Sequence, residues 1–164
     1  MKKFILLLTI HVAFVSFSFG QAAKSVYFEL GGPGLASFNF DTRFAPREDG
    51  IGGRIGVGGF SLTIDGETEG VIFVPLGLNY LLGNDGKNYF EIGGGVTPVF
   101  VSGSSGDGTF SSTFGHLSFG YRLQPEKGGF TFRAFISPVF AGFGFIPYYG
   151  GVSFGYKFGS SAEK

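Results

Sequence analysis

Tyr149-Gly-Gly-Val-Ser-Phe-Gly-Tyr-Lys-Phe158 is the stretch of sequence that decides the fold. In an extended chain, successive side chains point to opposite faces, so residues two apart share a face. Ser153 and Lys157 then lie on one face together with glycine. The other face is apolar and carries Val152, Phe154, Tyr156 and Phe158. Because the same alternation recurs along the chain, it predicts a small β-barrel whose apolar outer face contacts lipid.

Residues 1–20 have the features of a cleaved signal peptide. Lys2 and Lys3 form a basic start, and the apolar stretch Phe4–Phe19 follows them. Ser18 and Gly20 are small residues at the positions that precede a cleavage site. The alternative is a membrane-anchoring helix, which needs about 20 apolar residues and is longer than this stretch. We therefore expect a signal peptide at 1–20 and one barrel domain at 21–164.

The composition argues against several classes of protein. The chain has no cysteine, which excludes a lipid-modified cysteine and a disulfide framework. Without Lys2 and Lys3 it has ten basic and twelve acidic residues, and no basic cluster indicates a nucleic-acid partner. One of its two histidines lies in the predicted signal peptide, so no metal site is expected, and no cofactor-binding motif is found. The 31 glycines and 23 phenylalanines disfavour helices.

Turn-forming residues divide the remaining chain into seven apolar–polar alternating runs. The dividing segments are Ala45–Gly50, Asp65–Glu69, Gly83–Asn88, Ser102–Gly108, Gln124–Gly128 and Ala141–Pro147. A closed up-and-down barrel needs an even number of strands. The first run, Ser25–Phe44, is too long to cross a membrane once, and Gly31-Gly-Pro-Gly34 in its middle is a turn signal. Read as two strands, it completes an all-β, eight-stranded antiparallel up-and-down transmembrane β-barrel.

The register of this first hairpin follows from the faces of its side chains. A three-residue loop at Gly32–Gly34 keeps apolar residues opposite one another, whereas a two-residue loop would mix the two faces. The predicted apolar pairs are Leu30 with Ala36, Phe28 with Phe38 and Val26 with Phe40, and the polar-face pairs are Glu29 with Ser37 and Tyr27 with Asn39. Elsewhere Pro75 and Pro98 fall inside runs, where a missing donor predicts a bulge or a strand end.

Charged residues on the inward face are the first candidate site. They are Glu29, Glu91, Arg54, Arg122, Arg133 and Lys157. The interior of an eight-stranded barrel is only wide enough to be filled by side chains, and buried charges must pair. We expect a salt-bridged lumen that fixes the shape of the barrel. A narrow gated pore or a lumen site for a small ligand remains open, because many inward positions are glycines such as Gly77 and Gly93.

His116 and Ser118, with Glu91 on a neighbouring strand, are the candidates for catalysis. A histidine beside a serine, oriented by a carboxylate, is the minimal arrangement that activates a serine nucleophile. The His-x-Ser spacing is similar to that of outer-membrane lipid A deacylases, whose pair lies on the outside of the barrel. Here the alternation places both side chains inward. We therefore predict no catalytic residue and expect His116 to bond a carboxylate in the lumen.

The chain resembles the small outer-membrane β-barrel proteins of Bacteroidetes-type bacteria, with an OmpA/OmpX-like barrel architecture. The matching stretches are Ser25–Phe44, Val74–Gly83, Phe90–Gly95, Phe119–Gly128 and Gly150–Phe158. The last of these also looks like the C-terminal β-signal that the barrel assembly machinery reads, although residues 159–164 extend beyond its aromatic end. Members of such groups are mostly of unknown function, so the resemblance implies a cellular location and a fold without an activity.

The leading hypothesis is a non-enzymatic integral protein of the cell outer membrane, with a structural role or a minor role in the passage of small solutes. Its expected partners are outer-membrane lipid and lipopolysaccharide and the barrel assembly machinery, and the sequence does not set its oligomeric state. One alternative is a soluble secreted lipocalin-like barrel that binds an apolar ligand inside. The other is a lipid-modifying hydrolase that uses His116 and Ser118.

Overall fold

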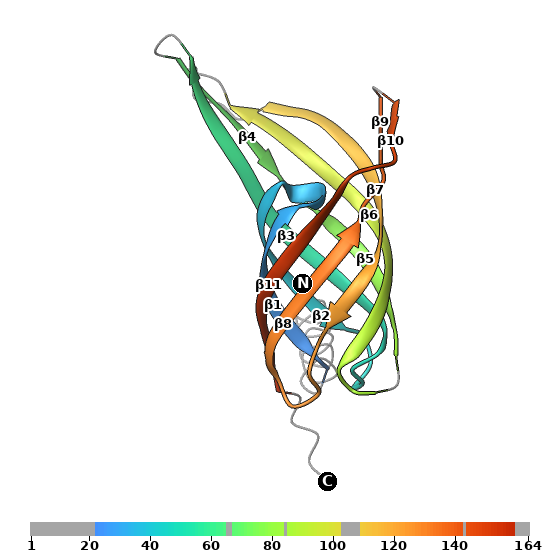
Figure 1. Cartoon of the computed structure of the whole chain (residues 1–164). Coiled ribbons are helices and arrows are strands. Elements are labelled where there is room, and N and C mark those ends of the chain that lie inside the picture. Colours follow the sequence, from blue (N-terminus) through green and yellow to red (C-terminus); the bar gives the residue numbers. More distant parts are fainter. Residues whose placement is uncertain (1–21, 65–66, 84, 103–108, 143, 160–164) are drawn as a thin grey trace, which may run out of the picture.

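The computed structural model describes residues 22–64, 67–83, 85–102, 109–142 and 144–159, so the predicted signal peptide lies outside the described residues. Most of the described chain is β-strand (Figure 1). The strands are β1 Lys24–Gly31, β2 Ala36–Arg43, β3 Gly50–Ile64, β4 Glu67–Phe73, β5 Leu76–Leu82, β6 Asn88–Ser102, β7 Thr109–Leu123, β8 Gly129–Ile136, β9 Val139–Ala141, β10 Gly144–Ile146 and β11 Gly150–Phe158. A 3-10 turn, η1 Gly32–Gly34, joins β1 to β2. Among the described residues, no helix is both long and apolar enough to cross a membrane.

The strands close into a barrel, because β1 pairs antiparallel with β2 on one side and with β11 on the other. Strands β4 and β5 both pair with β3 and with β6, so together they act as one interrupted wall strand. Strands β8 and β9 likewise share the neighbour β7. The short strand β10 pairs with β9. In the part of the chain that the structure describes, the wall is therefore a closed antiparallel barrel of eight strands, as predicted.

Proline accounts for the interruptions. Val74 and Pro75 separate β4 from β5, and Ser137 and Pro138 separate β8 from β9. A proline nitrogen cannot donate to the ladder, so each pairing stops and resumes after it. The strand end at Pro75 was expected from the sequence, whereas Pro138 was not singled out. Pro98 stays inside β6, and the register with β7 shifts directly after it, at Val99.

The β1–β2 hairpin has the predicted register. Leu30 lies opposite Ala36, and the polar-face pairs also match, including Glu29 with Ser37. The Gly31 N–H donates to the Leu35 carbonyl at 2.6 Å, which closes the three-residue loop. Gly31 has φ 76°, a left-handed conformation that glycine adopts without a Cβ clash.

The walls of the barrel are unequal in height. Strands β3, β6 and β7 have 15 residues each, whereas β1 and β2 have eight each. The predicted turn at Asp65–Glu69 is wrong in its extent, because β4 already begins at Glu67. The β-branched residue Thr63 favours the extended chain in this hairpin. The β3–β4 hairpin therefore rises far above η1 (Figure 1).

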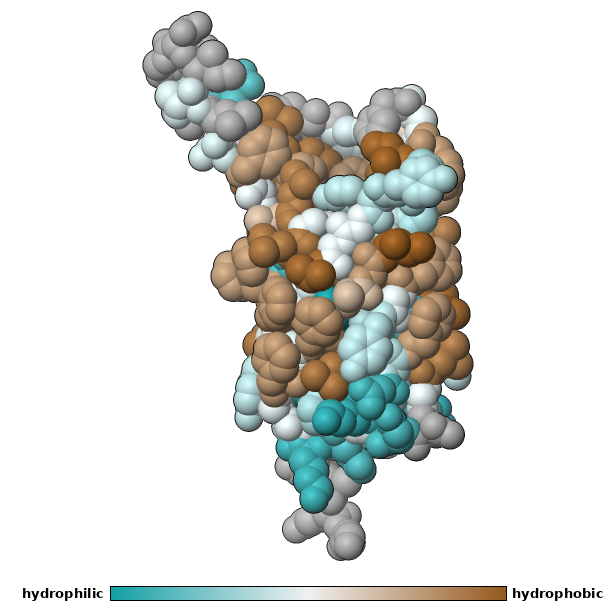
Figure 2. All heavy atoms as spheres, viewed as in Figure 1, coloured by the Kyte–Doolittle hydropathy of each residue, from teal (hydrophilic) through white to brown (hydrophobic). Residues whose placement is uncertain are grey.

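The two faces of the wall differ sharply in chemistry. Along β11, Phe154 is 44% exposed on the outside, while Ser153 is 1% exposed on the inside. Large apolar side chains on the other wall strands are exposed in the same way, including Phe38, Val57 and Phe130. Figure 2 shows this apolar surface around the middle of the barrel, with hydrophilic surface at the end where β11 ends. The core of the molecule is consequently polar and its surface apolar, the reverse of a water-soluble domain.

The closure between β1 and β11 can be tested by cross-linking. Leu30 lies directly opposite Val152, and Cβ atoms of such pairs are about 4.5–5.5 Å apart. We predict that the double variant Leu30→Cys/Val152→Cys forms an intramolecular disulfide, seen as faster migration of the denatured protein on a non-reducing gel. The matched pair Leu30→Cys/Phe154→Cys lies on the diagonal, about 7–8 Å apart, and should oxidise poorly. Equal oxidation of both pairs would contradict the register.

Candidate functional site: the lumen of the barrel

Seven charged side chains form a continuous chain of ion pairs across the lumen. Positive and negative groups alternate along it in the order Arg54, Glu29, Arg133, Glu91, Arg122, Asp41 and Arg43. These residues come from β3, β1, β8, β6, β7 and β2, so the chain ties together strands from all around the wall. All seven are at most 6% exposed. We call this set the lumen charge chain.

The geometry at the centre of the lumen charge chain is bidentate. Arg133 bonds both acidic neighbours, donating from Nη1 to Glu29 at 3.1 Å and from Nε to Glu91 at 3.0 Å, with a second bond from its Nη2 to Glu91. Its guanidinium carbon also lies 4.9 Å from the ring centroids of Tyr27 and Phe135. Guanidinium groups suit such sites because their donors are planar and fixed in direction. Arg133 therefore combines three hydrogen bonds to carboxylates with contacts to two aromatic rings.

The two ends of the lumen charge chain are held by similar contacts. At one end Arg54 donates to Glu29 at 3.0 Å and to the side-chain oxygen of Asn39 at 3.2 Å. At the other end Asp41 accepts from Arg122 at 2.9 Å and from Arg43 at 2.6 Å. The Asn79 amide adds a bond to Asp41 at 2.5 Å and accepts from Arg43. Because each buried carboxylate has at least two cationic partners, the desolvation cost of the charges is offset.

Inward glycines make the room that these long side chains occupy. A Cβ added at Gly77 would lie 3.4 Å from the Arg54 side chain, and one at Gly93 would lie 2.8 Å from the Ser118 hydroxyl. At Gly155 a Cβ would collide with Tyr27. The space that the sequence left open for a ligand at these positions is thus filled by side chains of the protein itself.

Lys157 belongs to a second, separate cluster at the end of the barrel where β1 begins and β11 ends. Its ammonium donates to Glu48 at 2.5 Å and to the Glu126 carbonyl at 2.6 Å. The Gln124 amide donates to the Glu48 backbone carbonyl at 3.1 Å. Glu48 comes from the β2–β3 turn, so this turn folds under the lumen. The cluster therefore covers this end of the barrel.

The neighbouring turn between β5 and β6 is held by its own carboxylate. Asp85 accepts hydrogen bonds from the backbone N–H groups of Lys87 at 2.9 Å and Asn88 at 2.6 Å, and from the Asn88 amide at 2.7 Å. These bonds, with that from the Asn88 side chain the largest influence, lower the pKa of Asp85 below its ordinary value. In the part of the chain that the structure describes, no group of three or more metal-ligating side chains is close enough to hold an ion.

The prediction from the sequence did not identify several residues that bond in the lumen. Asp41 and Arg43 are full members of the lumen charge chain, and Asn39 and Asn79 bond to it. The signal for the first two was present, because they continue the inward alternation that starts at Ser37 in the predicted hairpin. Glu48 could not be found this way, since it lies in a turn where the alternation of faces does not apply.

The structure places the three catalytic candidates inward but does not assemble them. His116 Nδ1 lies 3.4 Å from the Thr97 hydroxyl, so the carboxylate partner expected for this histidine is replaced by a threonine. Both carboxylate oxygens of Glu91 are held by Arg122 and Arg133. Within the described residues, no hydrogen bond links His116 to Ser118 or to Glu91. The arrangement therefore supplies no oriented base for the serine.

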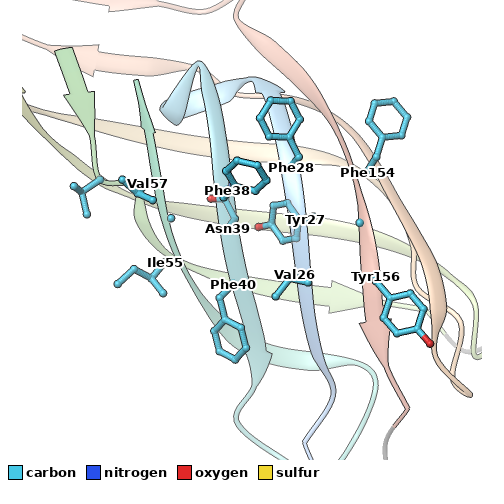
Figure 3. A pocket seen from close by; sticks show the side chains of 13 residues that line it. Val26, Tyr27, Phe28, Phe38, Asn39, Phe40, Ile55, Val57, Phe154 and Tyr156 are labelled. Carbon is cyan, nitrogen blue, oxygen red and sulfur yellow. The ribbon is translucent and has the colours of Figure 1, made fainter. Parts of the chain in front are cut away.

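The outer surface is a belt of aromatic and aliphatic side chains. On β11, Phe154, Tyr156 and Phe158 point outward and Val152 is half-buried on the same side. Rows of rings cross adjacent strands, with centroids 5.0 Å apart for Phe28 and Phe38. Figure 3 shows such side chains standing out from β11, β1, β2 and β3 around a shallow apolar groove of about 830 Å³. Among the described residues that line this groove, none is charged.

Known structures resemble the chain in fold. No protein-family model matches it, and neither does any curated protein sequence. The N-terminal β-barrel domain of Pseudomonas aeruginosa OprF matches with a TM-score of 0.56 and 11% sequence identity, over 84% of this chain and 96% of that chain. Neisserial surface protein A matches with a TM-score of 0.52 and 11% identity, over 84% of this chain and 94% of that one. These likenesses support the closed barrel fold.

The lumen charge chain predicts that replacing a buried arginine lowers the free energy of unfolding much more than replacing an exposed one. Arg133→Met leaves Glu29 and Glu91 with fewer partners, and breaking a buried ion pair costs about 3–5 kcal/mol. Arg47→Met is the control, because Arg47 and Asp49 form an ion pair 3.1 Å long with side chains 61% and 41% exposed. Such exposed pairs contribute at most about 1 kcal/mol. Equilibrium unfolding in urea measures both, and equal losses of stability would contradict the network.

Proposed function

We propose that the chain is an integral protein of the cell outer membrane, with a structural and non-catalytic role. The observation that carries this proposal is the distribution of side chains, with ion pairs inside a closed barrel and exposed aromatic residues outside. Such a surface is stable only where lipid replaces water, because exposed apolar area in water is unfavourable. The likeness to solved barrels supports the fold on which this rests.

Export and assembly complete the proposal. A signal peptide at residues 1–20 would direct the chain out of the cytoplasm, and the barrel domain would be formed from residues 21–164. The barrel assembly machinery would read β11, whose outward residues alternate up to Phe158. Outer-membrane lipid, including lipopolysaccharide, would surround the apolar belt. The kinship with small barrels of Bacteroidetes-type bacteria belongs to this proposal and rests on the sequence resemblance.

A structural role fits the lumen better than a role in solute passage. The lumen charge chain crosses the interior at its middle, and Lys157 with Glu48 covers the end where β11 ends. Water and ions would have to displace several paired charges in order to pass. The bonds of Arg133 to two carboxylates make that displacement costly.

Neither the lipocalin-like barrel nor the hydrolase fits the geometry as well as a structural membrane barrel does. A lipocalin-like barrel keeps its apolar residues inside to line a ligand cavity. Here Phe154 and Tyr156 are outside, while Glu29 and Arg133 are inside. A hydrolase acting through Ser118 would need a base oriented by a carboxylate, and Glu91 is already held by two arginines.

A charge in the belt tests the membrane environment. Phe154 lies at the middle of β11, opposite Phe28 and Phe132. We predict that Phe154→Arg lowers the free energy of unfolding in lipid vesicles by about 2–4 kcal/mol, the cost of arginine near the bilayer midplane. Phe154→Leu is the apolar control and should cost much less. A change within about 0.5 kcal/mol for Phe154→Arg, as is usual at a water-exposed site, would count against the proposal.

Electrical recording tests whether the lumen is closed. We predict that the purified protein, inserted in a planar lipid bilayer, gives no reproducible current steps, because paired side chains fill its interior. Insertion is checked on the same sample by protease protection in vesicles. Regular current steps from inserted protein would replace the structural role by a role in solute passage.

A further inference from the structure

The end of the barrel that carries the β1–β2 and β3–β4 hairpins is built differently from the rest. Strands β3, β4, β6 and β7 continue beyond the β1–β2 hairpin, so the wall is tall on one side and low on the other (Figure 1). The turn η1, which joins the two short strands, is buried and folds into the lumen. A Cβ on Gly32 would lie 2.7 Å from Glu29, so η1 sits directly above the lumen charge chain. This turn forms a floor under the tall part of the wall.

On the tall wall, the inward face becomes apolar. The inward alternation that places Arg54 in the lumen continues along β3 to Phe60, which lies opposite Val71. Phe73 pairs with Val99 on the same face, and its ring is 6.4 Å from that of Phe114. Several outward positions on the tall wall are polar, since Ser61, Thr63 and Thr113 are exposed. The inner face therefore becomes apolar along the barrel axis, while the outer face of the tall wall carries these polar residues together with the exposed Ile72.

Of these inward side chains, Phe73, Val99 and Phe114 line a cavity of about 440 Å³. Pro33 lies on its floor, Phe73, Val99, Phe114 and Val139 form the wall, and Ile146 stands at the rim. No charged residue lines it, and Ser112 and Tyr149 contribute its polar atoms. Cavities that bind small molecules usually measure about 300–1,000 Å³ and are mostly apolar. We call this space the apolar cup.

The low side of the wall connects the apolar cup with the outer belt. Leu35 lines the cup and is 39% exposed, and Leu30, which lies opposite the next residue Ala36, is 47% exposed on the outer face. Among the described residues other than glycine, Leu35 alone has a positive φ, at 59°. Such backbone strain is found at ligand clamps, where the surrounding structure maintains it. An apolar path thus leads from the lipid-facing surface over Leu35 into the cup.

We propose that the apolar cup binds a hydrocarbon chain, namely a fatty-acyl chain of a membrane lipid that enters over Leu35. The chemistry follows from the lining, which offers apolar contact and no group to pair with a charge. The head group of the lipid would stay at the open side, outside the cup. That the bound hydrocarbon comes from a membrane lipid rests on the proposed membrane location, whereas the affinity of the cup for hydrocarbon does not.

Photo-cross-linking to the full-length protein in phosphatidylcholine vesicles tests the proposal. Two probes are used in separate samples: a phosphatidylcholine with a diazirine in its acyl chain, and a free fatty acid with the same group. We expect the phospholipid probe to label residues of the cup wall, located by mass spectrometry. Labelling of the cup by the free fatty acid alone would overturn the membrane lipid as the source.

Matched tryptophan variants show whether the label depends on the cup. Val99→Trp fills the cavity and should reduce labelling of the cup about tenfold or more. Val96→Trp, on the outer face of the same strand, should leave it unchanged. If Val99→Trp does not fold, Val139→Phe is the second filling variant. Undiminished labelling in a folded filling variant, or label on outer-face residues alone, would overturn the proposal.

The control for membrane insertion is protease protection of the same vesicles. Failure to insert would contradict the membrane location itself, and the free fatty acid in detergent then tests the cup without it. Normal insertion with no label in the cup would contradict the cup alone.

Discussion

The buried ion pairs of the lumen are the constraint on which the rest of this structure depends. Charges inside a narrow barrel are tolerable only when each is paired, and Arg133 meets that condition by bridging Glu29 and Glu91. Because the chain of pairs uses strands from all around the wall, its formation requires that the barrel be closed. A polar interior in turn leaves the apolar half of every strand for the outside, where lipid is the suitable solvent.

Glycine and proline adapt the wall to this interior. Glycines on the inner face, such as Gly77 and Gly155, leave space beside Arg54 and Tyr27. Prolines at positions 75 and 138 divide two wall strands without opening the barrel. Above the β1–β2 hairpin the lumen charge chain ends, and apolar residues also occupy the inner face. The same strands thus form a closed polar lumen below η1 and an apolar cup above it.

Much of this architecture could be predicted from alternation alone. The eight-stranded barrel, the register of Leu30 with Ala36 and the inward direction of Glu91 and Arg133 follow from a period of two residues. Alternation could not show which charges meet, because partners such as Arg133 and Glu29 are far apart in sequence. It could not place Glu48, whose turn has no period. It does put Phe60 and Phe73 on the inner face, but it could not show that this part of the wall rises above the lumen charge chain, which requires knowing that β1 and β2 end early.

Heat-modifiability tests the central claim most directly. Protein extracted from the outer-membrane fraction in mild detergent is compared on a gel with and without boiling. A closed barrel held by buried ion pairs resists the detergent until it is heated, so the account predicts two mobilities and recovery in the outer-membrane fraction. A single mobility for protein recovered in the soluble fraction would contradict it.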